Sequence, residues 1–142
     1  MAAADFLGQL ADYLESHGVG VANGANVNIF VSSYPDDPDD IIALLGLPGS
    51  EMPNKYVQEF EYPHFQIMIR NSDYEAGAGK LREVREWLHD VLAMELVNFY
   101  VLRIQAQQDG YPIGRDEKGR YEFSINFNAQ HRYRDSGADS HP

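Results

Sequence analysis

A long and nearly uninterrupted alternation of apolar and polar residues toward the C-terminal end constrains the fold more than any other feature of the chain. The apolar positions are Tyr121, Phe123, Ile125, Phe127 and Ala129, and the polar positions between them are Glu122, Ser124, Asn126, Asn128 and Gln130. A period of two is typical of a half-buried strand in an antiparallel sheet, with one face on a core. Because Glu122 is the one charged residue on the polar face, we expect that face to hydrogen-bond another protein surface.

Two segments with apolar residues at helical spacing predict helices. The first begins after a cap at Asp5 and ends at His17 and Gly18, with an apolar stripe of Phe6, Leu10 and Leu14. The second covers about residues 74–92 after a cap at Ser72 or Asp73, with an apolar stripe of Leu81, Val84, Leu88 and Val91. Gly77 and Gly79 weaken its first turns, and they would allow a close backbone approach.

Four further apolar runs predict strands at residues 27–32, 41–45, 65–70 and 99–107. In the last of them we expect Tyr100, Leu102, Ile104 and Ala106 to share one face. The order of elements predicts an α+β fold, with a mostly antiparallel sheet of about five strands and two helices packed on one face. We expect a single domain over residues 1–134, a loop at 46–56 that depends on a partner for order, and a flexible tail over residues 135–142.

The helical and strand stripes of matching period predict the core. We expect the stripe of the second helix to pack on the apolar strand positions Phe65, Ile67, Ile69, Leu102, Ile104, Phe123 and Ile125.

Composition narrows the classes of function. A chain of 142 residues with 44% hydrophobic content suits one globular domain. The formal charge of -11, from 22 acidic and 11 basic residues, argues against a protein that grips DNA, because such binding depends on Lys and Arg. There is no cysteine, so disulfides and thiol chemistry are excluded. No apolar window approaches ~18 residues, and we expect no membrane span.

Several clusters of polar residues could in principle form chemical sites. Asp36, Asp37, Asp39 and Asp40 could hold a hard cation, but Pro38 interrupts the pattern of a calcium loop, so we interpret them as a solvated turn or an interface patch. Asp116, Glu117 and Lys118 resemble part of a nuclease motif, yet their place between Gly114 and Gly119 predicts a hairpin turn. The five histidines lack metal-pair spacing. We therefore predict no catalytic residue, metal or cofactor, and no enzyme.

Charged residues at strand ends are the candidates for contacts. Arg70 and Arg120 each stand near acidic residues, so they pair either within the chain or with carboxylates of a neighbouring subunit, for which the planar guanidinium is well suited. The predicted interface set comprises Asp36, Asp37, Asp39, Asp40, Arg70, Arg115, Asp116, Glu117, Lys118 and Arg120.

Three blocks in a fixed order carry a family resemblance. They are residues 63–70 followed by Asp73 and Tyr74, residues 106–108 leading through Pro112 to residues 114–116, and the alternating strand that begins at Tyr121. Together they resemble the tail terminator proteins of long-tailed bacteriophages, a family also described as phage minor capsid proteins. The resemblance runs from about Asn28 to Tyr133. Where the family often has a glycine pair after the second strand, this chain reads Gly46, Leu47, Pro48, Gly49.

The resemblance implies a structural virion protein of the tail and neck, made in the host cytoplasm. Such a protein forms a homo-oligomeric ring, typically of six subunits, that caps the tail tube and joins it to head-completion or stopper proteins. An acidic lumen would let DNA pass without specific binding. Two alternatives stay open at this point: another neck protein, such as a head-tail adaptor or stopper, or a small enzyme or ligand-binding α+β domain.

Overall fold

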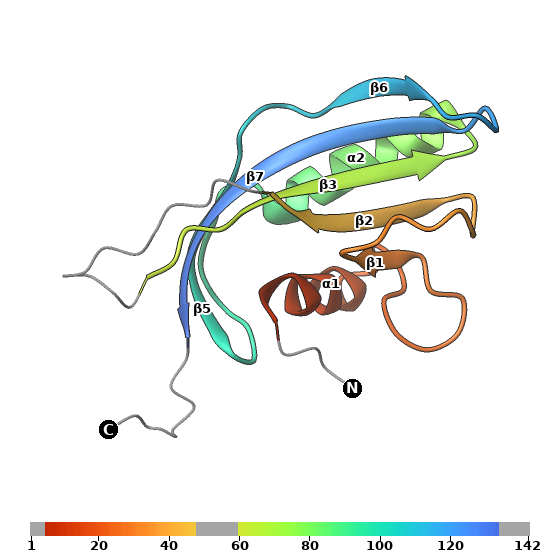
Figure 1. The fold of residues 1–142 in the computed structure, drawn as a ribbon. Helices are drawn as coiled ribbons and strands as arrows, with labels where there is room; N and C mark the ends of the chain where they lie inside the picture. Colours follow the sequence, from red (N-terminus) through yellow and green to blue (C-terminus); the bar gives the residue numbers. More distant parts are fainter. Residues whose placement is uncertain (1–4, 48–59, 134–142) are drawn as a thin grey trace.

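The computed structural model describes residues 5–47 and 60–133. The described elements, in chain order, are α1 (Phe6–Ser16), β1 (Ile29–Val31), β2 (Ile41–Gly46), β3 (His64–Asn71), α2 (Tyr74–Leu88), β4 (Val91–Glu95), β5 (Phe99–Ala106), β6 (Tyr111–Arg115) and β7 (Tyr121–Tyr133). Figure 1 shows the long strands β3 and β7 side by side, with β6 at one margin of the sheet and β1 and α1 at the other. The expected tail at 135–142 and most of the expected loop at 46–56 lie outside the described residues.

The expected five-stranded, mostly antiparallel sheet is wrong. The fold is mostly sheet: seven strands of the described residues form one mixed sheet, in the order β1-β2-β3-β7-β5-β4, with β6 beside β7. β1 and β2 pair in parallel, because residues 32–40 bring the chain back before β2 begins. The two strands that were not expected, β4 and β6, have five residues each and lie in segments whose sequence favours a helix and a turn.

The second helix is shorter than expected, and its last predicted turn is a strand. α2 ends at Leu88 because His89 takes an extended backbone conformation and Asp90 has a φ of 61°. Val91 and Met94 then pack against the core from β4 instead of from the helix. A short apolar run of this kind fits either period, so periodicity alone does not distinguish the two structures.

A bulge in β5 changes the face that its residues present. The register with β7 shifts between Val101 and Arg103, so Phe99, Val101 and Ile104 are buried while Leu102 is only half-buried. The expected face of Tyr100, Leu102, Ile104 and Ala106 is therefore wrong except for Ile104 and the partly buried Ala106. One extra residue reverses the alternation on either side of it, which a strict period of two cannot predict.

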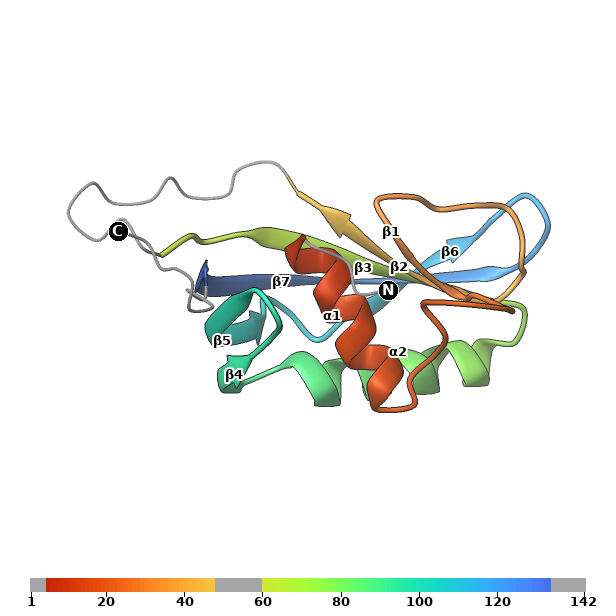
Figure 2. The same cartoon turned by 90° about the horizontal axis from the view of Figure 1, so that it is seen from below.

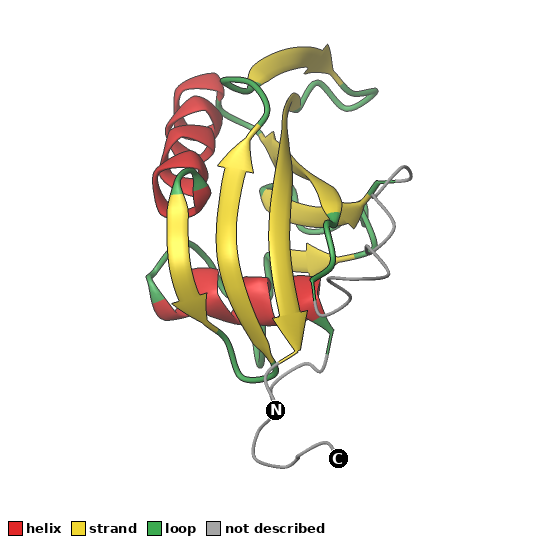
Figure 3. Cartoon of the chain, turned by 90° about the vertical axis from the view of Figure 1, so that its left-hand side faces the viewer, coloured by secondary structure: helices red, strands yellow, loops and turns green. Residues whose placement is uncertain are grey.

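The core lies between the sheet and the helices. Figure 2 shows both helices on the same side of the sheet, and Figure 3 shows that they run in different directions against it. Leu88 and Val84 of α2 are fully buried with Phe123 and Ile125 of β7, which confirms that α2 packs on the sheet. α1 contributes Phe6, whose ring meets Phe65 and Phe99 edge-on at 6.0 and 5.6 Å. Neither of these helices is long and apolar enough to cross a membrane.

One of the two side-chain helix caps predicted from the sequence forms in the structure. Asp73 precedes α2, and its Oδ2 accepts a hydrogen bond from the backbone N–H of Ala76 at 2.8 Å, which confirms the predicted cap. Asp5 occupies the corresponding position before α1 but makes no side-chain capping bond. Gly18, with a φ of 78°, follows the last residues of α1 and supplies the left-handed conformation that ends many helices.

Gly77 allows α2 to approach β7 closely, and this gives a test with an internal control. A Cβ at Gly77 would lie 2.4 Å from Cε1 of the buried Phe123, whereas a Cβ at Gly79 would meet nothing within 4 Å. We expect Gly77→Ala to lower the free energy of unfolding by about 1–3 kcal/mol. Gly79→Ala should instead raise it by up to about 1 kcal/mol, because alanine favours the helix. Chemical denaturation of both variants measures this, and equal effects of the same sign would contradict the close approach.

Candidate functional site

The structure brings most of the predicted interface set together in one place. Six charged residues form what we call the charged cluster, and they come from the loop at 32–40, the end of β3 and the turn between β6 and β7: Asp36, Asp39, Arg70, Asp116, Lys118 and Arg120. All of them except Asp39 line an open pocket of about 280 Å³, to which Tyr34, Glu117 and Glu122 also contribute. The loop and the hairpin turn, which are far apart in sequence, are thereby joined.

Arg120 is the centre of the charged cluster. Its Nε donates to Oδ2 of Asp116 at 2.8 Å, its Nη2 donates to Oδ1 of Asp36 at 2.7 Å, and its Nη1 reaches Oδ1 of Asp39 at 3.1 Å. The arginine side chain is only 7% exposed, while those of Asp36 and Asp39 are 59% and 64% exposed. The guanidinium therefore fixes the acidic loop to the hairpin from a buried position.

The side chain of Arg70 binds the backbone of the same loop. Its Nη2 donates to the carbonyl oxygens of Asp36 and Pro38 at 3.1 and 2.7 Å, and its Nε donates to that of Asp39 at 3.1 Å. The guanidinium also lies over the ring of Tyr34, 5.0 Å from its centroid. Tyr34 in turn donates from its hydroxyl to Glu122 on β7 at 2.7 Å. These contacts hold the loop against the face of the sheet that the helices leave uncovered.

The pairing changes the pKa values of the cluster. Hydrogen bonds from Lys118 and Arg120 lower the pKa of Asp36 to about 2, and the bond to Asp36 raises the pKa of Lys118. Burial acts to raise the pKa of Asp116, but its hydrogen bonds from Arg120 outweigh burial and lower it. Burial and the bond to Glu122 raise the pKa of Tyr34. These groups are therefore held in fixed charge states at neutral pH, which suits a structural cluster better than proton transfer.

The remaining members of the predicted interface set lie around the cluster. Asp37, Arg115 and Glu117 are exposed. Asp40 accepts hydrogen bonds from the backbone N–H and the hydroxyl of Ser72. The turn after Gly114 is held by bonds within the chain, because Asp116 accepts hydrogen bonds from the backbone N–H groups of Lys118 and Arg120.

Proximity of the loop and the turn could not be read from the sequence. Neither the acidic loop at 36–40 nor the turn at 115–120 has a sequence pattern that predicts contact with the other. The available signal is complementary charge: a cluster of aspartates on one side, and Lys118 and Arg120 on the other. The role of Tyr34 in covering Arg70 has no local signature at all.

The cluster does not present a metal site. In the part of the chain that the structure describes, no group of three or more His, Asp or Glu side chains could hold a metal ion. Asp36, Asp39 and Asp116 all point at guanidinium or ammonium groups. The arrangement can therefore fix two surface segments relative to each other and present the exposed charges around them.

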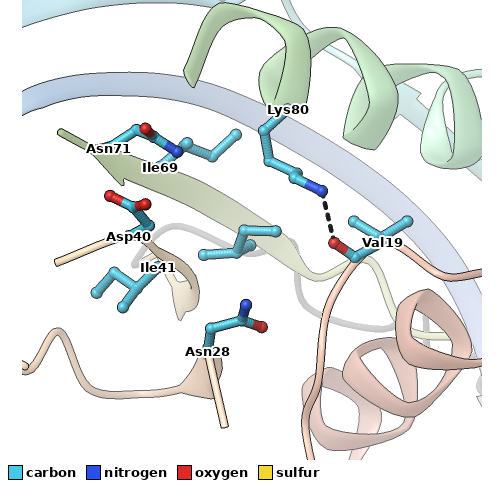
Figure 4. Close-up of a pocket in the computed structure, with 8 residues that line it drawn as sticks. Val19, Asn28, Asp40, Ile41, Ile69, Asn71 and Lys80 are labelled. Carbon is cyan, nitrogen blue, oxygen red and sulfur yellow. Dashed lines mark hydrogen bonds between the residues drawn. The ribbon is translucent and has the colours of Figure 1, made fainter. Parts of the chain in front are cut away.

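A second, smaller pocket lies between α2, the start of β2 and the end of β3 (Figure 4). Lys80 spans it, donating to the carbonyl oxygen of Val19 at 2.8 Å, and Asn28, Asp40 and Asn71 line it. Its volume of about 40 Å³ accommodates a few water molecules and no substrate of ordinary size. The contact joins α2 to the segment that follows α1.

The uncovered face of the sheet carries the uncharged polar residues that the alternating pattern predicted for it. Gln66 of β3 lies opposite Asn126 of β7 and donates to Oγ of Ser124 at 2.8 Å, while Gln107 donates to Oδ1 of Asn128. Oδ1 of Asn126 is buried and has no hydrogen-bond partner within the described residues. That oxygen is closed to a partner, but the half-buried amide groups of Asn128 and Gln130 can make further hydrogen bonds at the surface.

Arg120 and Lys118 test which of the ion pairs stabilise the fold. We expect Arg120→Met to lower the free energy of unfolding by about 2 kcal/mol, because it leaves three carboxylates without their shared cation. Lys118→Met should cost less than about 1 kcal/mol, since Lys118 and Asp36 are both well exposed. Urea denaturation measures both, and an Arg120→Met variant as stable as Lys118→Met would show that the cluster contributes little.

Comparison with known proteins then places the chain. A family model matches residues 13–133, and that family consists of structural proteins of phage tails. It is the family described as Bacteriophage tail terminator protein, and the chain belongs to it. The protein is therefore a tail component of the virion, and the resemblance drawn from the three sequence blocks is confirmed. No curated protein sequence matches the chain.

Proposed function

We propose that this protein forms a ring, typically of six subunits, that caps the head-proximal end of the phage tail tube. The ring stops polymerisation of the tube and joins it to the head-completion or stopper proteins. The observation that carries this proposal is the match of a tail terminator family to residues 13–133, which covers nearly all of the described fold.

Two features of the molecule support the proposal. The uncovered sheet face is rich in amide groups and poor in charge, which suits contact with another protein. The net charge of -11 suits a ring through which DNA passes without binding, because acidic groups repel the phosphate backbone. The proposal gives the protein no catalytic step, cofactor or metal.

We place partner contacts on the predicted interface set, with one refinement from the geometry. Asp36, Asp39, Arg70, Asp116 and Arg120 hold the loop and the turn together, so they position the surface. Asp37 and Glu117 are exposed and take no part in these contacts, whereas the exposed Arg115 donates from Nε to the carbonyl oxygen of Gly119 within the turn. Charge reversal at Glu117 is therefore a cleaner test of partner contact than reversal at Asp116.

Labelling of intact phage particles tests the position of the protein. An antibody against this chain, seen by electron microscopy, should mark a single site where the tail meets the head. Label along the whole tube, or at the distal tip, would contradict the proposal. A Glu117→Lys variant should keep its thermal stability and be incorporated less, whereas Arg82→Glu on the exposed face of α2 serves as the control for a charge reversal elsewhere.

A further inference from the structure

The exposed apolar side chains of this protein are distributed unevenly. Seven large ones are exposed in the described residues, and all lie between residues 74 and 133: Tyr74, Trp87, Leu92, Val97, Tyr111, Ile113 and Tyr133. Residues 5–47 contribute none. Leu92 is the most exposed of the seven, at 71%. They lie on α2, on β4 and the turn after it, on β6 and at the end of β7.

Leu92 stands on a strand that ends the sheet. β4 is the last strand in the order β1-β2-β3-β7-β5-β4, and it pairs only with β5 among the described strands. Arg103, the exposed cross-strand neighbour of Leu92, adds a positive charge beside it. An outer strand with a protruding leucine and an unpaired backbone edge is a site where another chain can bind.

The opposite end of the sheet carries a groove of matching character. It lies between α1 and β1, holds about 290 Å³, and has apolar walls that include Ala11, Phe30 and Val31. Its opening is acidic, because Asp5 and Asp12 line it. Phe30 lines the groove, is half-buried and lies outside the hydrophobic core cluster.

The backbone of β1 is also turned toward this groove. The carbonyl of Asn28 accepts from the N–H of Ile42 on β2, and the N–H of Ser32 donates to the carbonyl of Leu44 on β2, both at 2.8 Å. The N–H groups of Asn28 and Ile29 instead donate to the carbonyl of Val21 at 2.8 and 3.0 Å. The N–H and C=O of Val31 therefore point away from β2. A strand laid along β1 would find backbone partners there as well as an apolar wall.

We infer that β4 of one copy docks on the groove between α1 and β1 of a second copy. Leu92 enters between Phe30 and Ala11, and Arg103 approaches the acidic opening formed by Asp5 and Asp12. Because the two surfaces differ and lie at opposite ends of the strand order, the contact is head-to-tail, and repetition with the right rotation closes a ring. The inference rests on the proposed ring and names the surfaces that build it.

Cysteine cross-linking tests the contact. The natural chain has no cysteine, so every disulfide that forms must come from an introduced residue. The variant carrying both Leu92→Cys and Phe30→Cys should give, on oxidation, a ladder of linked chains that a reductant reverses. A mixture of the two single variants should give only linked dimers, and each single variant alone should stay unlinked. Arg82→Cys combined with Phe30→Cys is the matched control and should not form a ladder. The reaction is run on concentrated protein and on assembled tails.

Charge at the same positions gives a second readout. Leu92→Asp and Phe30→Glu should each abolish the ring while leaving the melting temperature near that of the natural chain, since neither side chain is in the core cluster. The two variants mixed together should form dimers, because each retains one intact surface. Arg82→Gln, which changes the net charge by the same amount as Leu92→Asp, should leave the ring intact.

The outcomes separate this inference from the proposed function. Rings on tails in which the double-cysteine variant never cross-links would overturn the β4-to-groove contact and leave the terminator function standing. Linked dimers from Leu92→Cys alone would also overturn it, because they show a symmetric contact. Failure of the unaltered protein to occupy the head-proximal end of tails would instead defeat the proposed function.

Discussion

Phe123→Ala should lower the free energy of unfolding by about 3–5 kcal/mol, a large part of the stability of a domain of this size. Phe123 is 1% exposed and stands on β7, the strand that pairs with β3, β5 and β6. Its ring lies 5.4 Å from that of Tyr74 at the start of α2, and it fills the space that Gly77 leaves open. Truncation removes the apolar contact that joins the helix to the sheet, so a cavity remains.

Urea denaturation followed by circular dichroism measures this effect. Leu88→Ala, on the helical side of the same core, should cost about 2–5 kcal/mol for the same reason. Ile113→Ala is the matched control, since Ile113 is 47% exposed and should change stability by less than about 0.5 kcal/mol. A Phe123→Ala variant as stable as the Ile113→Ala variant would refute the packing of α2 on β7.

Stability should fall as the pH is lowered from 7 to 4, and His131 should cause most of the loss. His131 is 3% exposed, and its ring lies between those of Phe6 and Phe99 at centroid distances of 4.3 and 4.8 Å. Burial lowers the pKa of His131 to about 4 from 6.5. As the pH falls, His131 therefore binds a proton at a higher pH in the unfolded chain than in the folded chain. The stability that is present above pH 6.5 is progressively lost down to about pH 4. The loss amounts to roughly 3 kcal/mol.

A variant that cannot titrate isolates this contribution. His131→Phe places another ring between Phe6 and Phe99, and its unfolding free energy should change little over this pH range. The lowered pKa of Asp36 stabilises the fold above its ordinary value of 3.8, and this contribution is lost only below that pH. It therefore does not affect the measurement between pH 7 and pH 4. Parallel pH curves for the natural chain and His131→Phe, from urea titrations at several pH values, would show that the buried imidazole is not the cause.

The bounds of α1, the start of α2 and the buried face of β7 were predictable, because local sequence signals determine them. The apolar positions of the alternation from Tyr121 to Ala129 form one face of β7, and all of them are buried or packed on the core. α1 was predicted within a residue of its observed ends, since Gly18 must end it. α2 began as predicted because Asp73 caps it.

The short elements were not predictable, for physical reasons that differ. β4 has five residues, too few for its apolar pattern to distinguish a strand from a last helical turn. β6 contains Pro112 and Gly114, which argue against a strand. They are tolerated because β6 is an outer strand that pairs on one side only, with β7. The parallel pairing of β1 with β2 is a long-range property that neither strand encodes locally.

The arrangement of the charged cluster was not predictable from the sequence, and the role of its residues in partner contacts stays a prediction. The sequence marked Asp36, Arg70 and Arg120 as charged residues at loop and strand ends. Whether Arg120 pairs within the chain or with a neighbour depends on the path of residues 32–40, and the structure shows the pairing within the chain. The groove between α1 and β1 could not be anticipated, because it depends on β1 being the outermost strand.

The length of tail tubes assembled with and without this protein tests the central claim most directly. Purified tube subunits that polymerise in its presence should stop at a set length, and electron micrographs should show extra ring density at one end of each tube. Preformed tubes should likewise stop growing once the protein is added. Tubes that lengthen at the same rate with the protein as without it, and that carry no ring at either end, would contradict the account.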